Sequence, residues 1–391
     1  MKGNYSEVRR LEKAEGVSDS GGRHTVPALT SEVTLRGEPR SLKRKFGERR
    51  AQRHSPLITE TTSLAGNGGF NRRRLIRSTL VLVGLVMASM GLAPVANGQQ
   101  IVATTGMLAD SARALAGDFV TVNGLMGEGV DPHLYRPTRA DLVLLQRADL
   151  IVYNGMLLEG RMGDVLSRLQ RRGRSVHAIA ELVFANSGRK PLLEDENESD
   201  PHIWMDVSLW REAVAIMARI MINDFPGQAD AIRANLKRYD AELALLDAYA
   251  REVLGTIPES RRVLITAHDA FGYLGAAYGI EVRGIQGIST ESEAGLRDIN
   301  QLIDFIVRND IPAIFLETSV ADRNVRALIE GARARGHSLV IGGELFSDAM
   351  GPKGHWTGTY IGMIDHNVST IANALGGSAP EGGFRVWREE Q

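Results

Sequence analysis

The segment Gln228–Leu254, QADAIRANLKRYDAELALLDAYAREVL, differs from every other part of this chain of 391 residues. Its apolar side chains recur at alternating spacings of four and three, at Ile232, Leu236, Tyr239, Leu243, Leu246, Ala250 and Val253. No Gly or Pro interrupts the run, which follows Pro226-Gly227 and ends before Gly255. The pattern predicts one amphipathic helix, roughly 40 Å long at 1.5 Å per residue. A coiled coil is a weaker interpretation because the seam is short and lies in mid-chain. We therefore expect a rigid helix over residues 227–256 that connects two lobes.

Short apolar strands alternate with helices before this segment. The pattern predicts strands at Ile101–Thr105, Val120–Leu125 and Leu150–Tyr153, and a helix with Leu108, Ala112, Leu115 and Ala116 turned inward. Thr138 and Asp141 are suited to cap a helix that runs through Leu145. Such β-α-β alternation is typical of a parallel sheet with helices on both faces. We assign residues 99–226 to an N-terminal α/β lobe.

The same alternation resumes after the long helix. The pattern predicts strands at Val263–Thr266, Glu281–Gly284, Ala313–Glu317 and Ser338–Ile341, and helices at Ser292–Arg308, Asp322–Arg335 and Thr359–Leu375. We assign residues 257–380 to a C-terminal α/β lobe and residues 381–391 to a tail. The predicted fold class is α/β, with two lobes of mostly parallel sheets and flanking helices, joined by one long backbone helix.

The composition limits the classes of function. The chain is 43% hydrophobic and 24% charged, which is enough apolar material for two domains. A formal net charge of -1 gives no sign of a nucleic-acid partner. The sequence contains no cysteine, so disulfides, thiolate metal sites and a cysteine nucleophile are excluded. On the same ground we expect no lipid anchor on an N-terminal cysteine.

Residues 71–98 have the pattern of an export signal. Four arginines (Arg72, Arg73, Arg74 and Arg77) precede an apolar run from Leu80 to Leu92, and Ala96-Asn97-Gly98 offers a cleavage site before Gln99. A single membrane anchor is the alternative, but the run is short and is interrupted by Gly84, Ser89 and Gly91. Residues 1–70 are polar and lack a sustained period, so we interpret them as disordered or as an extension from a start codon placed too far upstream.

Four residues in short, unusual contexts are candidate metal ligands: His133, His202, His268 and Asp348. His133 and His202 each end an Asp-Pro-His triplet, His268 follows Thr266-Ala267, and Asp348 lies in Gly342–Gly351. His133, His268 and Asp348 follow predicted strands, and ligands bind beyond the carboxyl ends of strands in open parallel sheets. Three imidazoles and one carboxylate suit a divalent first-row transition metal rather than calcium or magnesium. No short spacing joins them, so only the fold brings them together.

Each of these residues also has an ordinary structural interpretation. A single His near a strand end is more often a hydrogen-bonding residue than a ligand. Asp131 and Asp200 could accept from imidazole N–H groups, or they could be turn residues of the Asp-Pro-His loops. Aromatic residues lie close to each His (Tyr135, Trp204 and Phe271), where they could wall a dry cavity or belong to the core. The remaining histidines lie in loops, in a helix or before residue 71 and are poorer candidates.

Other chemistries fit the sequence poorly. It contains no His-Glu-x-x-His pair, P-loop or Gly-x-Ser-x-Gly elbow, and Gly284–Gly287 is no dinucleotide fingerprint. A catalytic zinc keeps one position open and needs a general base, whereas four protein ligands favour capture. Glu317 and Glu344 could act as bases, so a metal-dependent hydrolase stays an alternative.

These four motifs carry a resemblance to a known family. Residues 100–376 resemble the metal-binding solute-binding proteins of bacterial ABC importers, of the Znu/Tro type (cluster A-I). The motifs match that family's four ligand positions in order and spacing, and Thr266–Gly279, Gly287–Glu293 and Gly342–Gly351 are similar to the Tro-type members. The resemblance implies metal held in the cleft between two lobes and delivery to a membrane permease driven by a cytoplasmic ATPase.

Two departures bear on the metal. The acidic stretch 187–199 contains no histidine, unlike the His-rich loop of dedicated zinc scavengers, and His268 stands where manganese-selective relatives often have Glu. We expect manganese as the transported ion, with zinc or iron(II) as alternatives. We further expect a monomeric periplasmic protein that is exported through a cleaved signal peptide, is not a lipoprotein, is not an enzyme and binds no nucleic acid. A surface adhesin stabilised by metal is the other alternative.

Overall fold

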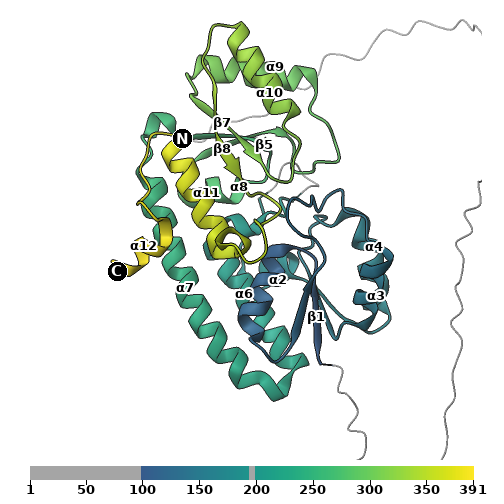
Figure 1. Ribbon diagram of the computed structural model, residues 1–391. Coiled ribbons are helices and arrows are strands. Elements are labelled where there is room, and N and C mark those ends of the chain that lie inside the picture. Colours follow the sequence, from purple (N-terminus) through teal and green to yellow (C-terminus); the bar gives the residue numbers. More distant parts are fainter. Residues whose placement is uncertain (1–97, 193–198) are drawn as a thin grey trace, which may run out of the picture. The chain divides into compact units, whose positions relative to one another are not determined.

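The computed structural model describes residues 98–192 and 199–391, and Figure 1 shows their arrangement. The predictions for residues 1–70, for nearly all of the export signal and for the acidic centre of the 187–199 stretch lie outside the described residues. Among the helices that the structure describes, none combines the length and the apolar character needed to cross a bilayer.

A four-stranded parallel sheet forms the first lobe. Its order is β2-β1-β3-β4, with β1 at Gln100–Ala103, β2 at Thr121–Gly124, β3 at Leu150–Tyr153 and β4 at Ser175–Ala178. Helices α2 (Gly106–Ala116), α3 (Arg139–Arg147), α4 (Gly163–Arg171) and α5 (Ile179–Ser187) connect and follow these strands. Ile101 and Ile151 are fully buried, as expected for central parallel strands covered on both faces. Thr138 and Asp141 form the predicted capping box of α3.

Two parallel strand pairs form the second lobe. β5 (Val263–His268) pairs with β6 (Glu281–Gln286), and β7 (Ala313–Glu317) pairs with β8 (Val340–Leu345). β5 lies beside β7, and helices α8 (Gly272–Tyr278), α9 (Leu296–Arg308) and α10 (Arg323–Ala334) flank the strands (Figure 1). α9 begins four residues later than predicted because Gly295, with extended backbone, is its N-cap. Residues 287–295 therefore form a loop between β6 and α9.

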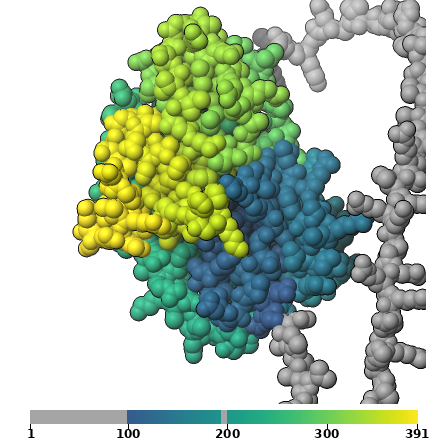
Figure 2. Space-filling view, viewed as in Figure 1, coloured from purple at the N-terminus to yellow at the C-terminus, as the bar shows by residue number. Residues whose placement is uncertain are grey.

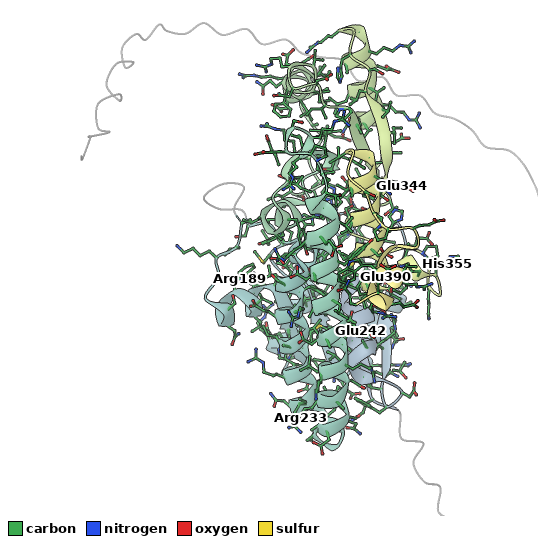
Figure 3. The ribbon with its side chains drawn as sticks, turned by 90° about the vertical axis from the view of Figure 1, so that its left-hand side faces the viewer. Arg189, Arg233, Glu242, Glu344, His355 and Glu390 are labelled. Carbon is green, nitrogen blue, oxygen red and sulfur yellow. The ribbon has the colours of Figure 1, made fainter. Side chains whose placement is uncertain are left out.

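The long helix predicted from Gln228–Leu254 is α7, which spans Ala229–Gly255. Its predicted apolar positions Ile232, Tyr239, Leu243, Leu246, Ala250 and Val253 are buried, whereas Leu236 is half-buried. This face packs against α2, α6 (Val207–Asp224) and α11 (Tyr360–Ala374). Arg233 and Glu242 lie on the opposite, outer side (Figure 3). α7 thus provides one continuous support along both lobes, and the predicted two-lobe α/β fold class is confirmed.

The C-terminal segment joins the two lobes through buried contacts. The Tyr360 hydroxyl donates to the backbone carbonyl of Trp204 (2.8 Å), and the Trp204 indole N–H donates to the carbonyl of Ser347 (2.9 Å). The ring of Tyr360 also stacks on Trp210, with centroids 5.3 Å apart. Figure 2 shows this segment, in yellow, against both the green and the blue residues. Residues 381–391, predicted as a tail, include helix α12 (Gly383–Glu389), whose Phe384 is fully buried.

Candidate metal centre

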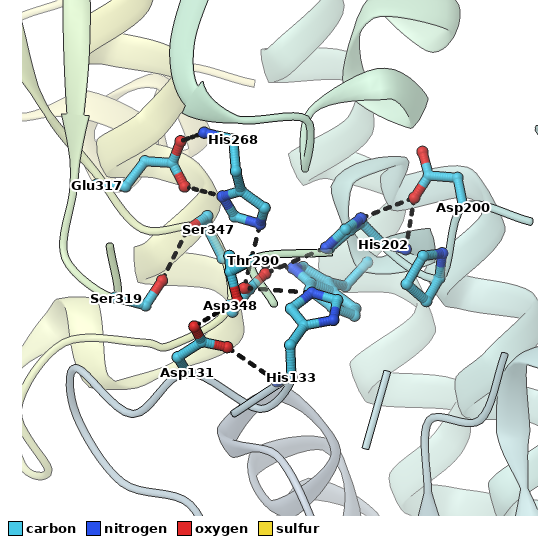
Figure 4. Close-up of polar contacts among 12 residues, drawn as sticks. Asp131, His133, Asp200, His202, His268, Thr290, Glu317, Ser319, Ser347 and Asp348 are labelled. Carbon is cyan, nitrogen blue, oxygen red and sulfur yellow. Dashed lines mark hydrogen bonds and ion pairs between the residues drawn. The ribbon is translucent and has the colours of Figure 1, made fainter. Parts of the chain in front are cut away.

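The structure brings all four predicted ligand residues together. One potential ligand atom from each of His133, His202, His268 and Asp348 lies within 4.8 Å of the others, and all four residues are buried. The Asp348 carboxylate lies at the centre of the group. Its Oδ2 is 3.8 Å from Nε2 of His133 and 3.2 Å from Nε2 of His268, and its Oδ1 is 3.4 Å from Nε2 of His202 (Figure 4).

The four residues come from four different elements. His133 lies in the loop between β2 and α3, and His202 directly precedes the short 3-10 helix Ile203–Met205. His268 is the last residue of β5, and Asp348 lies in the loop after β8. His268 was predicted to lie just past the end of its strand, and this prediction was wrong. The parallel pairing of β5 with β6 continues as far as His268 opposite Gln286, so the strand itself fixes the backbone of this residue.

The inward-facing atoms of the group have no hydrogen-bond partner. Nε2 of each of the three histidines and both carboxylate oxygens of Asp348 are among the few buried side-chain atoms without a partner in the described part of the chain. Leaving such atoms unpaired is costly, and native proteins do so rarely. A tetrahedral metal with ligand bonds of about 2.1 Å separates its ligand atoms by about 3.4 Å. The distances from Asp348 to Nε2 of His268 and His202, 3.2 and 3.4 Å, are close to this value, and the distance to His133, 3.8 Å, is longer.

Carboxylates hold the far side of two of the imidazole rings. Nδ1 of His202 lies 2.8 Å from Oδ1 of Asp200, which also accepts from the backbone N–H of His202 (2.8 Å), so both interpretations of Asp200 apply. Nδ1 of His268 lies 2.5 Å from Oε2 of Glu317, whose Oε1 also accepts from the backbone N–H of His268. A carboxylate at Nδ1 favours the tautomer with the proton on Nδ1, which leaves the lone pair of Nε2 directed at the centre.

The role of Glu317 differs from the one considered from sequence. Glu317 ends β7, and β7 lies beside β5, which carries His268. The carboxylate is fully committed to the ring and backbone of His268, so the structure does not present it as a free general base. Sequence reasoning missed this because only the adjacency of β5 and β7, which are far apart in the chain, brings the two side chains together.

Asp131 supports its histidine in another way. Its Oδ1 accepts from the backbone N–H groups of His133 (2.8 Å) and Leu134 (3.4 Å), and its Oδ2 accepts from the hydroxyl of Thr290 (2.6 Å). These contacts match the interpretation of Asp131 as a turn residue rather than as an acceptor for imidazole. The Thr290 contact was not anticipated, and it links the loop before α9 to the loop that carries His133 (Figure 4).

The aromatic residues near the histidines take different roles. The Trp204 ring stands edge-on to His202, with centroids 5.2 Å apart, and Trp204 and Phe271 are fully buried. Tyr135 is only half-buried and donates its hydroxyl to Asp141, away from the centre. Of the other described histidines, His355 is exposed at the outer surface (Figure 3) and His366 contacts the carbonyl of Glu344.

The environment gives the three imidazoles different proton affinities. Burial lowers the pKa of His133 to about 3. Burial also opposes a charge on His202, but Asp200 and Asp348 outweigh it and raise the pKa to about 9. Glu317 and Asp348 likewise outweigh burial at His268 and raise its pKa well above the ordinary value. His268 and His202 overcome the desolvation of Asp348 and hold its pKa well below the usual range. These shifts favour a proton on His202 and His268 and the charged form of Asp348 before an ion binds.

Comparisons with known proteins place this geometry in context. The family model of the zinc-uptake complex component A periplasmic proteins (ZnuA) matches residues 101–374. The manganese-binding lipoprotein MntA of Bacillus subtilis is 44% identical over 277 residues, which cover 71% of this chain and 89% of MntA. The zinc-binding protein TroA of Treponema pallidum is 47% identical over 281 residues, 72% of this chain and 90% of TroA. The manganese ABC transporter substrate-binding lipoprotein PsaA of Streptococcus anginosus is 28% identical over 301 residues, which cover 76% of this chain and 96% of PsaA.

Solved structures agree with these relatives. The periplasmic zinc-binding protein TroA from Treponema pallidum superposes with a TM-score of 0.69 at 46% identity, covering 71% of this chain and 99% of TroA. The Fe(III)-bound YtgA from Chlamydia trachomatis superposes with a TM-score of 0.66 at 27% identity, covering 72% of this chain and 99% of YtgA.

One prediction about location has to be corrected. The expectation of a periplasmic protein that is not a lipoprotein is wrong, because MntA and PsaA are both named as lipoproteins. The expectation rested on the lack of cysteine in the sequence. The lack of cysteine in this sequence does not show that the protein has no lipid anchor.

Proposed function

The chain belongs to the ZnuA family, the metal-binding solute-binding proteins of bacterial ABC importers, and we propose that His133, His202, His268 and Asp348 are the ligands of its transported metal ion. The observation that carries the proposal is the set of buried, unpartnered atoms that face one another: the three Nε2 atoms and both oxygens of Asp348. A divalent cation satisfies all of them at once. With three imidazoles and a carboxylate as donors, a transition metal is favoured over a hard alkaline-earth ion.

Manganese is the ion that we propose, with zinc and iron(II) as alternatives. Both oxygens of Asp348 lack partners, so the carboxylate can bind through either oxygen or through both. A bidentate carboxylate supplies five donor atoms, one more than the four of a closed zinc site, and carboxylate oxygen suits manganese. In free competition the same site holds zinc more tightly, because zinc stands above manganese in the Irving–Williams order. The ion carried in the cell then depends on which metal is available.

Delivery to a transporter is the second part of the proposal. We propose that the loaded protein acts as a monomer and passes its ion to a membrane permease driven by a cytoplasmic ATPase. PsaA is named as the substrate-binding component of an ABC transporter, which supports this partner. Four protein ligands around the ion and the commitment of Glu317 to His268 favour holding over turnover, so the hydrolase alternative is disfavoured.

Metal analysis tests the ligand assignment. We expect the purified wild-type protein to carry close to one equivalent of transition metal. His202→Ala and Asp348→Ala should lose it while their circular dichroism spectra stay unchanged. His355→Ala is the matched control, because this histidine is exposed and outside the centre. Competition titrations with manganese, zinc and iron(II) then rank the ions. Full metal content in His202→Ala would contradict the proposal.

A further inference from the structure

A cleft that opens to the surface lies beside His133. The cleft has a volume of about 350 Å³ and is lined by both lobes: His133, Arg161 and Pro201 on one side, and Ile288 and Glu291 on the other. Of the four candidate ligands, His133 lines this cleft, and His202 and His268 are fully buried behind it. An ion that enters by this route meets His133 first, and an ion that leaves passes His133 last.

Two contacts bridge the lobes across the mouth of this cleft. The Thr290 hydroxyl donates to Oδ2 of Asp131 at 2.6 Å, and Arg161 Nε lies 3.4 Å from Oε1 of Glu291. Thr290 and Glu291 are neighbours in the loop between β6 and α9. The Arg161–Glu291 pair is about half exposed, so water screens it and it contributes little. The Thr290–Asp131 bond is short, partly buried and made to a charged acceptor, which makes it the stronger of the two.

The Thr290–Asp131 bond acts directly on a ligand residue. Asp131 uses Oδ2 for Thr290 and Oδ1 for the backbone N–H of His133, so one carboxylate joins the second lobe to the main chain of His133. By contrast, the lobes are joined on the far side by buried contacts such as Trp204–Ser347 and Tyr360–Trp204. Because the mouth is bridged by one partly buried bond and one half-exposed ion pair, we expect the lobes to separate there more easily than at these buried contacts.

We propose that Thr290 is a positioning residue, which sets the place of His133 through Asp131 and keeps the mouth closed over the bound ion. The inference rests on the proposed function, because it concerns the release of the same ion. Its consequence is kinetic. Loss of the Thr290 hydroxyl leaves the ligand set complete but frees the His133 loop, so the ion leaves faster while its entry is little affected.

The test compares three variants of the whole protein. Thr290→Val removes the hydroxyl at nearly constant volume, and Thr290→Ser retains it. Ser289→Ala is the matched control, because the hydroxyl of Ser289 accepts from Glu291 within its own loop. Each protein is loaded with manganese or zinc, and release into excess chelator is followed by stopped flow, together with the association rate and the melting temperature of the metal-free protein.

We expect Thr290→Val to release the ion about tenfold faster. This is the lower end of the effect seen when residues that hold metal ligands in place are changed. Its association rate and metal-free melting temperature should stay near those of the wild type. Thr290→Ser and Ser289→Ala should release at the wild-type rate. Equal release by Thr290→Val and the wild type, or equal acceleration by Thr290→Ser, would overturn the inference alone. A wild-type protein that binds neither ion would overturn the proposed function as well.

Discussion

His268 and His133 approach the same carboxylate from different lobes, but the fold holds them in different ways. His268 ends a strand, and Glu317 fixes both its ring and its backbone N–H. His133 lies in a loop, borders the solvent cleft and is held by Asp131 through its main chain. The comparison leads us to expect that the centre has a preformed side, made by His268, His202 and Asp348, and a side where the position of His133 depends on its loop.

The largest expected effect comes from removing one histidine at a time. His268→Ala should weaken metal binding by more than about 100-fold, because outer-shell changes alone cost 10- to 100-fold and this change removes a ligand. His133→Ala should lose about tenfold less, since the preformed side keeps three ligands and water can reach the vacant position through the cleft. Competition against a chelating dye measures both dissociation constants. If His133→Ala lost as much affinity as His268→Ala, the two sides would be equivalent.

The carboxylates behind the rings give the next largest effect. Glu317→Gln and Asp200→Asn keep the size of each side chain but remove the charge that fixes the ring tautomer. We expect each to weaken metal binding by about 10- to 100-fold. Asp240→Asn provides the matched control, because it removes a carboxylate that pairs with Arg211 away from the centre. Isothermal titration of the four proteins measures the change, and an unchanged affinity in Glu317→Gln would show that the ring needs no support from Glu317.

The dependence of binding on pH separates the same two sides. Metal binds neutral imidazole, so a ring that is protonated in the free protein must lose its proton. The pKa of His202 is raised to about 9 and that of His268 is raised well above its ordinary value, whereas the pKa of His133 is lowered to about 3. Affinity should therefore keep rising as the pH increases from 6 to 9, with protons released by His202 and His268 and none by His133.

Titrations in buffers with different ionisation enthalpies count the released protons. We expect His202 to release close to one proton per ion at pH 7, because its pKa is raised to about 9, and His268 to add to this number, because its pKa is raised well above the ordinary value. Asp200→Asn should release fewer, since Asp200 is a main cause of the raised pKa of His202. An affinity that stays flat above pH 6.5, as for ordinary histidines, would contradict this assignment of the charges.

Local patterns in the sequence were sufficient to predict helices and strands that bury one face. The four-three spacing of Ile232 to Val253 predicted α7, and the Thr138/Asp141 pair predicted the cap of α3. Helix α6 was not predicted, although its buried residues lie on one side of the helix and Asp206 is a common type of N-cap. The four candidate ligand residues, which the structure brings together, were proposed from their local motifs and the family resemblance.

The support of the ligands could not be predicted in the same way. Asp131 and Asp200 occupy the same position in two Asp-Pro-His triplets, and each accepts from the backbone N–H of its histidine. Asp131 also accepts from Thr290, whereas Asp200 also contacts the imidazole ring of His202. The contact between Thr290 and Asp131 joins residues 159 positions apart. Contacts at such separation depend on how the lobes pack, which the local sequence of an Asp-Pro-His triplet does not encode.

The smallest expected effect concerns the far end of the His133 loop. Oδ2 of Asp141 accepts from the Thr138 hydroxyl (2.7 Å), the Thr138 N–H (2.6 Å) and the Tyr135 hydroxyl (2.7 Å), which ties the loop to α3. Thr138→Ala removes the cap and should lower the free energy of unfolding by about 1 kcal/mol. Metal affinity should change less than about threefold, because Asp131 and not the cap holds the N–H of His133.

Urea unfolding of the metal-free protein and a metal titration measure these two quantities separately. Thr138→Ser should restore the stability, because it keeps the capping hydroxyl. The result complements Thr290→Val, for which we expect faster release at unchanged stability. A large loss of affinity in Thr138→Ala would mean that both ends of the loop position His133. In that case the difference between the two sides of the centre would lie in the whole loop rather than in the single contact between Asp131 and Thr290.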